Sequence, residues 1–302
     1  MRIGLQVPYL SWAGGPDRLG ETFAAIAQRA EQSGFYSLWL MDHFLQIPGV
    51  GRPEEDMIEG YAGLSFAAGL TKSIKLGTMV TGATYRNPGV LVKTATTLDV
   101  LSGGRAYFGV GAGWFQQEHD AFGIPFGTWT QRFQKLEEAL RIAHQMWDPD
   151  DHGPFEGKHF RFAETLCVPH PVSRPHPPIL IGGRGEKKTL RFVAKYADAW
   201  NMGGGIPNED NFNTFVRLSA VLKDHCDREG RDYDAIEKTV LFTFMVRDEG
   251  GGHWQTPQQT LDWLRRFRDA GLDQPIINTP FVDSPHTLEY IAENIITPIS
   301  SW

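Results

Sequence analysis

The chain of 302 residues has little cysteine, no long apolar run and no block of positive charge, and each absence excludes a class of protein. Its two cysteines, Cys167 and Cys226, lack the spacing of a metal site and are too few for a disulfide framework. We therefore expect reduced thiols in a cytoplasmic protein. No stretch approaches the roughly 18 apolar residues of a membrane span, and the first residues do not resemble a signal peptide.

The acidic residues outnumber the basic ones, with 36 Asp and Glu against 29 Lys and Arg, which gives a net charge of −7. Because the basic residues form no cluster, we expect neither a nucleic acid nor an anionic membrane as a partner. The expected partner is a small-molecule substrate, and a homodimer remains open. A glycine-rich dinucleotide fingerprint is also missing after the first predicted strand, which argues against an open doubly wound sheet.

What the sequence does contain is a regular alternation of β-rich runs and segments of helical period. In the first unit, residues 2–7 precede a segment in which Leu19, Phe23, Ile26 and Ala30 lie on one helical face. Seven more units follow this pattern. The predicted strands cover residues 2–7, 37–44, 74–82, 105–113, 177–183, 198–204, 237–248 and 274–281.

Eight strand–helix units predict the α/β class and a parallel sheet closed into a (β/α)₈ TIM barrel, formed by residues 1–302 as one domain. Residues 148–178 interrupt the alternation with turn residues and dense prolines. We predict that this segment is a loop or hairpin inserted after the fourth helix. Its histidines show no repeating ligand spacing, so we predict no metal site there.

Titratable and glycine-rich segments follow several of the predicted strands. In a parallel barrel, functional residues gather at the carboxyl ends of the strands. The second strand runs into Asp42 and His43, the fifth into the turn 182–185, and the sixth ends at Asn201. The glycines of residues 182–185 allow backbone N–H groups to approach an anion, and Arg184 adds positive charge. Lys187 and Lys188 follow directly. This turn therefore predicts a phosphate-binding site.

These motifs, taken together, carry a family resemblance. The segment LGTMVTGATYRNPGVLVKTATTLDVLSGGRAYFGVGAGW, with MDHF before it and IGGRGEKKTLRFVAKYADAWN after it, resembles the bacterial luciferase-like superfamily. More narrowly, it is similar to the oxidoreductases that depend on the deazaflavin coenzyme F420. The resemblance spans nearly the whole chain and implies a (β/α)₈ barrel with an insertion. It also implies hydride transfer between C5 of the deazaflavin and a small organic substrate.

The resemblance assigns roles to particular positions. It places Asp42 and His43 beside the reactive face of the deazaflavin ring, and it implies a cis peptide bond between Met79 and Val80 behind that ring. Histidine suits proton transfer because its charge ordinarily changes near neutral pH, and Asp42 is expected to orient the ring of His43. The expected cofactor-binding residues are Met79, Val80, Gly111, Ala112, Gly113, Gly182, Gly183, Arg184, Gly185 and Asn201.

The sequence departs from the family pattern at Trp114. In the glucose-6-phosphate dehydrogenase branch, a glutamate that serves as proton donor occupies this position. A sugar-phosphate substrate is therefore not expected, and His43 is left as the leading candidate to move the proton, with Glu118 as a possible substitute acid. We expect Trp114 and Trp12 to wall an apolar substrate pocket.

Three other functions remain open on sequence grounds. An FMN-dependent monooxygenase would use the same barrel and is the nearest alternative, with FMN as the alternative cofactor. A non-catalytic protein that binds F420 or a flavin would retain the cofactor residues without turnover. A metal-dependent barrel hydrolase ranks lowest, because the predicted strand ends lack paired histidine or carboxylate ligands.

Overall fold

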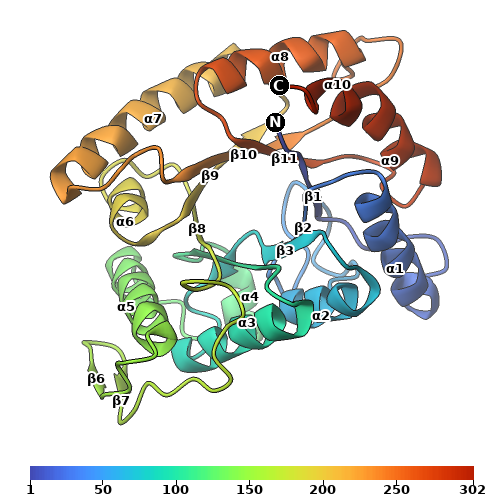
Figure 1. Ribbon diagram of the computed structural model, residues 1–302. Coiled ribbons are helices and arrows are strands. Elements are labelled where there is room, and N and C mark those ends of the chain that lie inside the picture. The colour runs from blue at the N-terminus through green and yellow to red at the C-terminus, as the bar shows by residue number, and fades with distance from the viewer.

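The computed structural model describes residues 1–302, and its centre is a ring of eight parallel strands (Figure 1). The ring closes where β3 pairs with β5. A ninth short strand, β4 (Thr81–Gly82), lies beside β5 and follows a cis peptide bond between Met79 and Val80. The barrel strands are β1 (Gly4–Val7), β2 (Ser37–Leu40), β3 (Lys75–Thr78), β5 (Ala106–Gly111), β8 (Ile179–Gly182), β9 (Ala199–Gly205), β10 (Glu237–Thr243) and β11 (Gln274–Asn278). The predicted TIM barrel and cis peptide are confirmed.

Helices surround this ring and bury their apolar faces against it (Figure 1). Local signals fix their ends: Thr128 and Gln131 form a reciprocal capping box at the start of α5, and Gly103 ends α3 with a positive φ of 71°. The helices are α1 (Pro16–Gln32), α2 (Gly60–Leu70), α3 (Pro88–Ser102), α4 (Gln116–Ala121), α5 (Trp129–Trp147), α6 (Thr189–Tyr196), α7 (Glu209–Glu229), α8 (Pro257–Asp269), α9 (Pro285–Ile291) and α10 (Thr297–Ile299), with a π-helical turn (Ala292–Ile296) before the last. None of them is long and apolar enough to cross a membrane.

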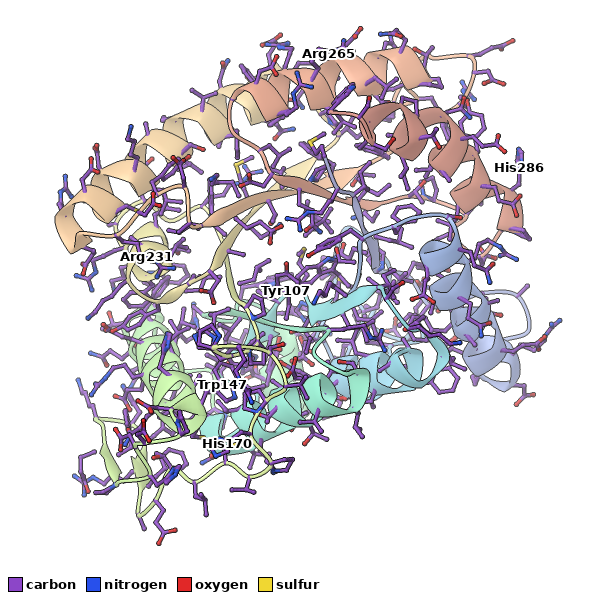
Figure 2. All side chains as sticks on the ribbon, in the orientation of Figure 1. Tyr107, Trp147, His170, Arg231, Arg265 and His286 are labelled. Atoms are coloured by element: carbon purple, nitrogen blue, oxygen red, sulfur yellow. The ribbon has the colours of Figure 1, made fainter.

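Side chains fill the middle of the barrel, so that a ligand cavity forms only at its carboxyl end. The side chains packed in the middle of the barrel include Trp39, Met79, Tyr107 and Leu180. Figure 2 shows Tyr107 among the strands. The Tyr107 hydroxyl donates to Glu237 Oε2 at 3.0 Å. Burial raises the pKa of the Tyr107 phenol and of the Glu237 carboxyl above their ordinary values, although Arg2, which pairs with Glu237 at 2.8 Å, opposes this for the carboxyl.

The segment between α5 and β8 lies outside the ring of strands. It carries a short antiparallel hairpin of β6 (Phe155–Glu156) and β7 (Arg161–Phe162), which projects beyond α5 in Figure 1. The part of this segment that follows the hairpin is attached to α3, because Asp99 accepts hydrogen bonds from the backbone N–H groups of Val172 and Ser173. Helix α4 was not predicted, because six residues are too few to show a helical period.

Candidate active site

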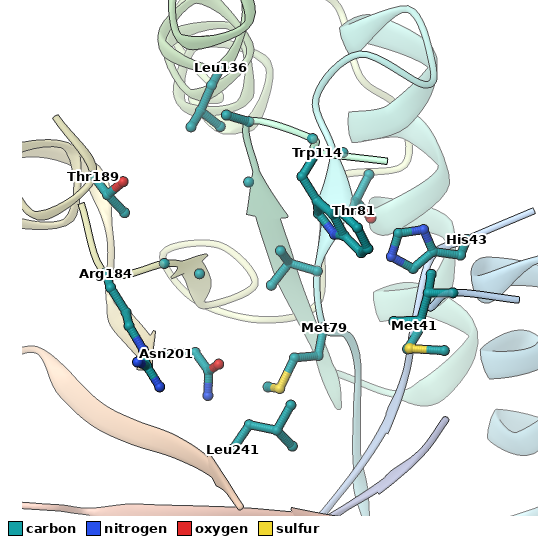
Figure 3. A pocket seen from close by; sticks show the side chains of 18 of the residues that line it. Met41, His43, Met79, Thr81, Trp114, Leu136, Arg184, Thr189, Asn201 and Leu241 are labelled. Carbon is teal, nitrogen blue, oxygen red and sulfur yellow. The ribbon is translucent and has the colours of Figure 1, made fainter. Parts of the chain in front are cut away.

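A cavity of about 470 Å³ opens at the carboxyl ends of the barrel strands (Figure 3). Its walls come from loops and strand ends on opposite sides of the ring. This is expected in a parallel barrel, where the carboxyl ends of all strands lie at the same end. Twelve of the residues proposed from the sequence line this cavity: His43, Met79, Val80, Gly111, Ala112, Gly113, Trp114, Gly182, Gly183, Arg184, Gly185 and Asn201. Asp42 and Trp12 do not.

Asp42 forms a buried ion pair and does not contact the ring of His43. Its carboxylate accepts two hydrogen bonds from the Arg86 guanidinium, at 2.6 and 2.8 Å, and Arg86 also donates to Glu59. Although burial opposes the charge, these hydrogen bonds and the negative charges of Asp42 and Glu59 raise the pKa of Arg86 above its ordinary value. The expectation that Asp42 orients His43 is therefore corrected.

Trp12 is likewise displaced from its expected role. Its half-buried indole packs against the main hydrophobic core and is absent from the cavity wall. It lies in the irregular segment between β1 and α1, where no periodic pattern fixes the direction of a side chain. Trp114, by contrast, lines the cavity as expected, and its ring centroid lies 5.7 Å from that of His43.

The partner of His43 is Glu118, which lies on the six-residue helix α4 that follows β5. His43 Nδ1 lies 2.7 Å from Glu118 Oε2, and the Tyr85 hydroxyl donates to the same oxygen at 3.0 Å. The other carboxylate oxygen accepts the backbone N–H of Phe44. Glu118 is completely buried, and these three donors replace the water that a carboxylate would otherwise bind.

This geometry determines which nitrogen of His43 faces the ligand. A carboxylate oxygen only accepts hydrogen bonds, so we assign the proton between His43 and Glu118 to Nδ1. Nε2 makes no hydrogen bond with the protein, and His43 lines the cavity. Burial, followed by the negative charge of Glu118, raises the pKa of the Tyr85 phenol, which keeps its hydroxyl as a donor. Nε2 is thus the atom available for proton transfer.

The opposite wall consists of the glycine turn that follows β8. Gly183 has a backbone φ of 137°, which residues other than glycine rarely adopt. At Gly182 a side chain would be crowded, because an added Cβ would lie 3.1 Å from Val80 Cγ1. The Arg184 guanidinium donates to the carbonyl of Gly203 and lines the cavity. Asn201 is fixed beside it by a 2.8 Å hydrogen bond from Nδ2 to Thr239 Oγ1. Because the glycines leave the backbone uncovered by side chains, a flat ring can lie close to it, and Arg184 can pair with an anionic group on the same ligand.

The cation cluster predicted at this turn is smaller than expected. Of the three basic residues, only Arg184 lines the cavity. The ammonium of Lys188 lies 5.2 Å from the centroid of the Phe133 ring, and Lys187 is exposed to solvent. Helix α6 begins at Thr189, whose side chain is buried and reaches the cavity wall.

A family model for luciferase-like monooxygenases matches residues 1–271 of the chain. The chain belongs to this family. One relative of this luciferase-like protein is an F420-dependent glucose-6-phosphate dehydrogenase from Kineococcus radiotolerans, 29% identical over 227 residues, which cover 72% of this chain and 61% of that one. Another is an FMNH(2)-dependent dimethylsulfone monooxygenase from Pseudomonas putida, 29% identical over 284 residues, which cover 84% and 75% of the two chains.

The fold is shared with a solved structure of coenzyme F420-dependent tetrahydromethanopterin reductase from Methanopyrus kandleri. The TM-score is 0.79, with 17% identity and 99% of each chain covered. Family membership makes this luciferase-like protein an oxidoreductase, and its relatives include users of F420 and of FMN.

Sequence reasoning missed two of the residues that organise the site. Tyr85 and Arg86 are adjacent in the segment between β4 and α3, and the quoted family segment contained both without assigning either a role. Their position at the carboxyl end of the third predicted strand was the available signal. The structure adds Thr81 and Gln6 to the cavity wall as well.

Proposed function

We propose that this luciferase-like protein is a cytoplasmic F420-dependent oxidoreductase that transfers a hydride between the deazaflavin and a small organic substrate. The observation that carries the proposal is the orientation of His43, whose Nδ1 is held by buried Glu118 while Nε2 is free at the cavity wall. When bound, the reduced deazaflavin supplies the hydride at its C5. The protein must supply binding, orientation and a proton.

The chain's own residues suit these tasks. His43 delivers a proton from Nε2 to the reduced substrate or removes one in the reverse direction, and Glu118 and Tyr85 keep its ring in place. The glycine turn with Arg184 suits the phosphate of the cofactor, as the cavity walls leave room for its ring against Met79 and Val80. The buried rings of Tyr85 and Phe115 pack edge-on against the ring of His43 and limit the water around it.

The second candidate is an FMN-dependent monooxygenase. It is favoured by the dimethylsulfone monooxygenase relative, whose alignment covers 84% of this chain. Both cofactors present a flat tricyclic ring and a phosphate, so the cavity suits either group in shape. The MDHF motif and the F420-dependent relative support the deazaflavin.

Reconstitution separates the two candidates. The purified protein is titrated with F420 and with FMN, and we expect quenching of deazaflavin fluorescence at micromolar protein with much weaker binding of FMN. Loaded with reduced F420 in the absence of oxygen, it should oxidise the cofactor only when an organic acceptor is added. Oxygen uptake with reduced FMN would instead support the monooxygenase. Binding of F420 without turnover of any acceptor would leave the non-catalytic alternative standing.

A further inference from the structure

The cavity has an uneven distribution of charge. Among its 26 lining residues, Arg184 is the only Lys or Arg, and there is no Asp or Glu. Arg184 lies on the side of Asn201 and Thr189, whereas His43 lies across the cavity beside Trp114 and Met41 (Figure 3). The wall around the proton-transferring nitrogen therefore holds no lysine or arginine, and the only positive charge there is that of protonated His43, which Glu118 already pairs.

The side of the cavity that contains His43 is apolar and aromatic. Met41, Ile47 and Val50 contribute aliphatic surface, and Trp114 contributes an indole. Trp114 and Trp129 both line the cavity, yet their exposed fractions are 54% and 59%. Large aromatic surfaces exposed together at one opening typically mark a binding site, because a ligand that covers them removes apolar area from water.

Building on the proposed function, we infer that the substrate of this site is a neutral carbonyl compound with an apolar ring or chain, or the matching alcohol. The single arginine at the glycine turn is committed to the phosphate of the cofactor, so an anionic substrate group buried beside Trp114 and Val50 would meet no lysine or arginine, and the charge of protonated His43 is already paired by Glu118. Such burial is strongly unfavourable, whereas an apolar ring gains from the same surface.

The redox balance of the reduction fits the groups on this wall. The carbonyl carbon gains a hydride, which carries both electrons, and the carbonyl oxygen gains a proton from His43 Nε2. The two electrons come from the reduced deazaflavin, which would be oxidised by losing that hydride, and His43 recovers its proton from solvent. Only one polar atom of the substrate has to meet a polar atom of this wall, which suits a ketone with an otherwise apolar body.

Matched acceptors test the inference with the complete, cofactor-loaded protein. The pairs are cyclohexanone with 4-oxocyclohexanecarboxylate, and acetophenone with 4-acetylbenzoate, which differ only by one carboxylate. We expect kcat/KM for oxidation of reduced F420 to be about 100-fold higher or more for each neutral member, as for an unpaired charge in a desolvated pocket. Faster turnover of the anionic members, or no turnover of either neutral ketone, would overturn the inference.

A charge placed on the wall provides the matched variants. Val50→Lys adds a cation to the loop that carries His43, and Val50→Met adds similar length without charge. We expect Val50→Lys to reduce the preference for the neutral ketones by about tenfold, as expected for a nearby opposite charge, while Val50→Met keeps the preference. An equal change in both variants would mean that shape rather than charge selects the substrate, and would overturn the inference.

The outcomes separate the inference from the proposed function. Tight F420 binding with a preference for anionic ketones would refute the substrate class and leave the proposed function intact. Absence of F420 binding would refute the proposed function, and the same ketone pairs would then be measured with the FMN-loaded protein, in which neutral preference still supports the inference. Failure to bind either cofactor would overturn both.

Discussion

Two groups of polar and charged residues, each built around a completely buried carboxylate, lie side by side at the carboxyl end of the barrel, and they differ in how completely their polar atoms are paired. In the first, which we call the His43 cluster, Glu118 binds His43 and Tyr85. In the second, the Arg86 cluster, Asp42 and Glu59 bind Arg86. Both Glu118 and Asp42 are completely buried. Only the His43 cluster leaves a nitrogen free at the cavity wall.

Two stretches of chain contribute to both clusters, and Glu118 and Glu59 complete them from other parts of the chain. Asp42 and His43 are adjacent after β2, and Tyr85 and Arg86 are adjacent before α3. Each stretch contributes one residue to each cluster, although Asp42 and His43 follow the end of β2 and Tyr85 and Arg86 lie in the turn after β4. In each pair of neighbouring residues, one therefore belongs to the His43 cluster, which is suited to proton transfer, and the other to the Arg86 cluster, which is suited to stabilising the fold.

The largest effect that we expect comes from removing the free nitrogen of the His43 cluster. In His43→Asn, the shorter amide can still donate to Glu118, but no group remains to transfer a proton. We expect kcat to fall by about 10²–10⁴, the usual contribution of a general acid or base, with F420 affinity changed by only a few fold. Anaerobic turnover and fluorescence titration measure the two quantities. Unchanged kcat would remove His43 from the proposed mechanism.

The Arg86 cluster should respond in stability. Arg86→Met leaves the Asp42 carboxylate buried without a partner, and breaking a buried ion pair in this way costs about 3–5 kcal/mol. Urea unfolding measures the loss. The matched control is Arg18→Met, because Arg18 pairs with Glu21 at the surface, where water and salt screen the pair and its loss has little effect on stability. Equal losses in the two variants would mean that the buried pair has no special importance.

The sequence predicted the barrel well because the alternation of strands and helices repeats eight times, and each repeat supplies its own periodic signal. The positions of the glycine turns followed from it, since parallel strands bring their carboxyl ends to one edge. The pairing of His43 could not be predicted in this way. Its partner Glu118 lies 75 residues away in a six-residue helix, and the adjacent Asp42 was the wrong choice because its carboxylate pairs with Arg86.

The third prediction compares the two buried carboxylates directly by the same chemical change. Glu118→Gln keeps the size of the side chain but replaces an ionic hydrogen bond to His43 with a neutral one, so we expect kcat to fall by about 10- to 100-fold with KM little changed, as for the loss of a group that orients a catalytic residue. Asp42→Asn should instead lower the urea midpoint and leave the kcat of the folded protein unchanged. Similar losses of kcat in both would contradict the separation of the clusters.

The smallest effect concerns Glu31, a carboxylate outside both clusters that is held mainly by backbone N–H groups. Its Oε1 accepts from Lys72 N at 2.8 Å, Ser73 N at 2.6 Å and Ile74 N at 3.0 Å. Burial opposes its charge, but these hydrogen bonds prevail and lower the pKa of Glu31 from 4.5 to about 2.

Because the pKa of Glu31 is lower in the folded than in the unfolded chain, its stabilising contribution is complete above pH 4.5 and is lost as the pH falls toward about 2. Glu31→Gln removes this titration. The free energy of unfolding, measured in urea across that range, should therefore fall less steeply with acid in the variant than in the unmodified protein. Parallel curves would mean that the pKa of Glu31 is the same in the folded and the unfolded chain. Other carboxylates would then cause the loss of stability in acid.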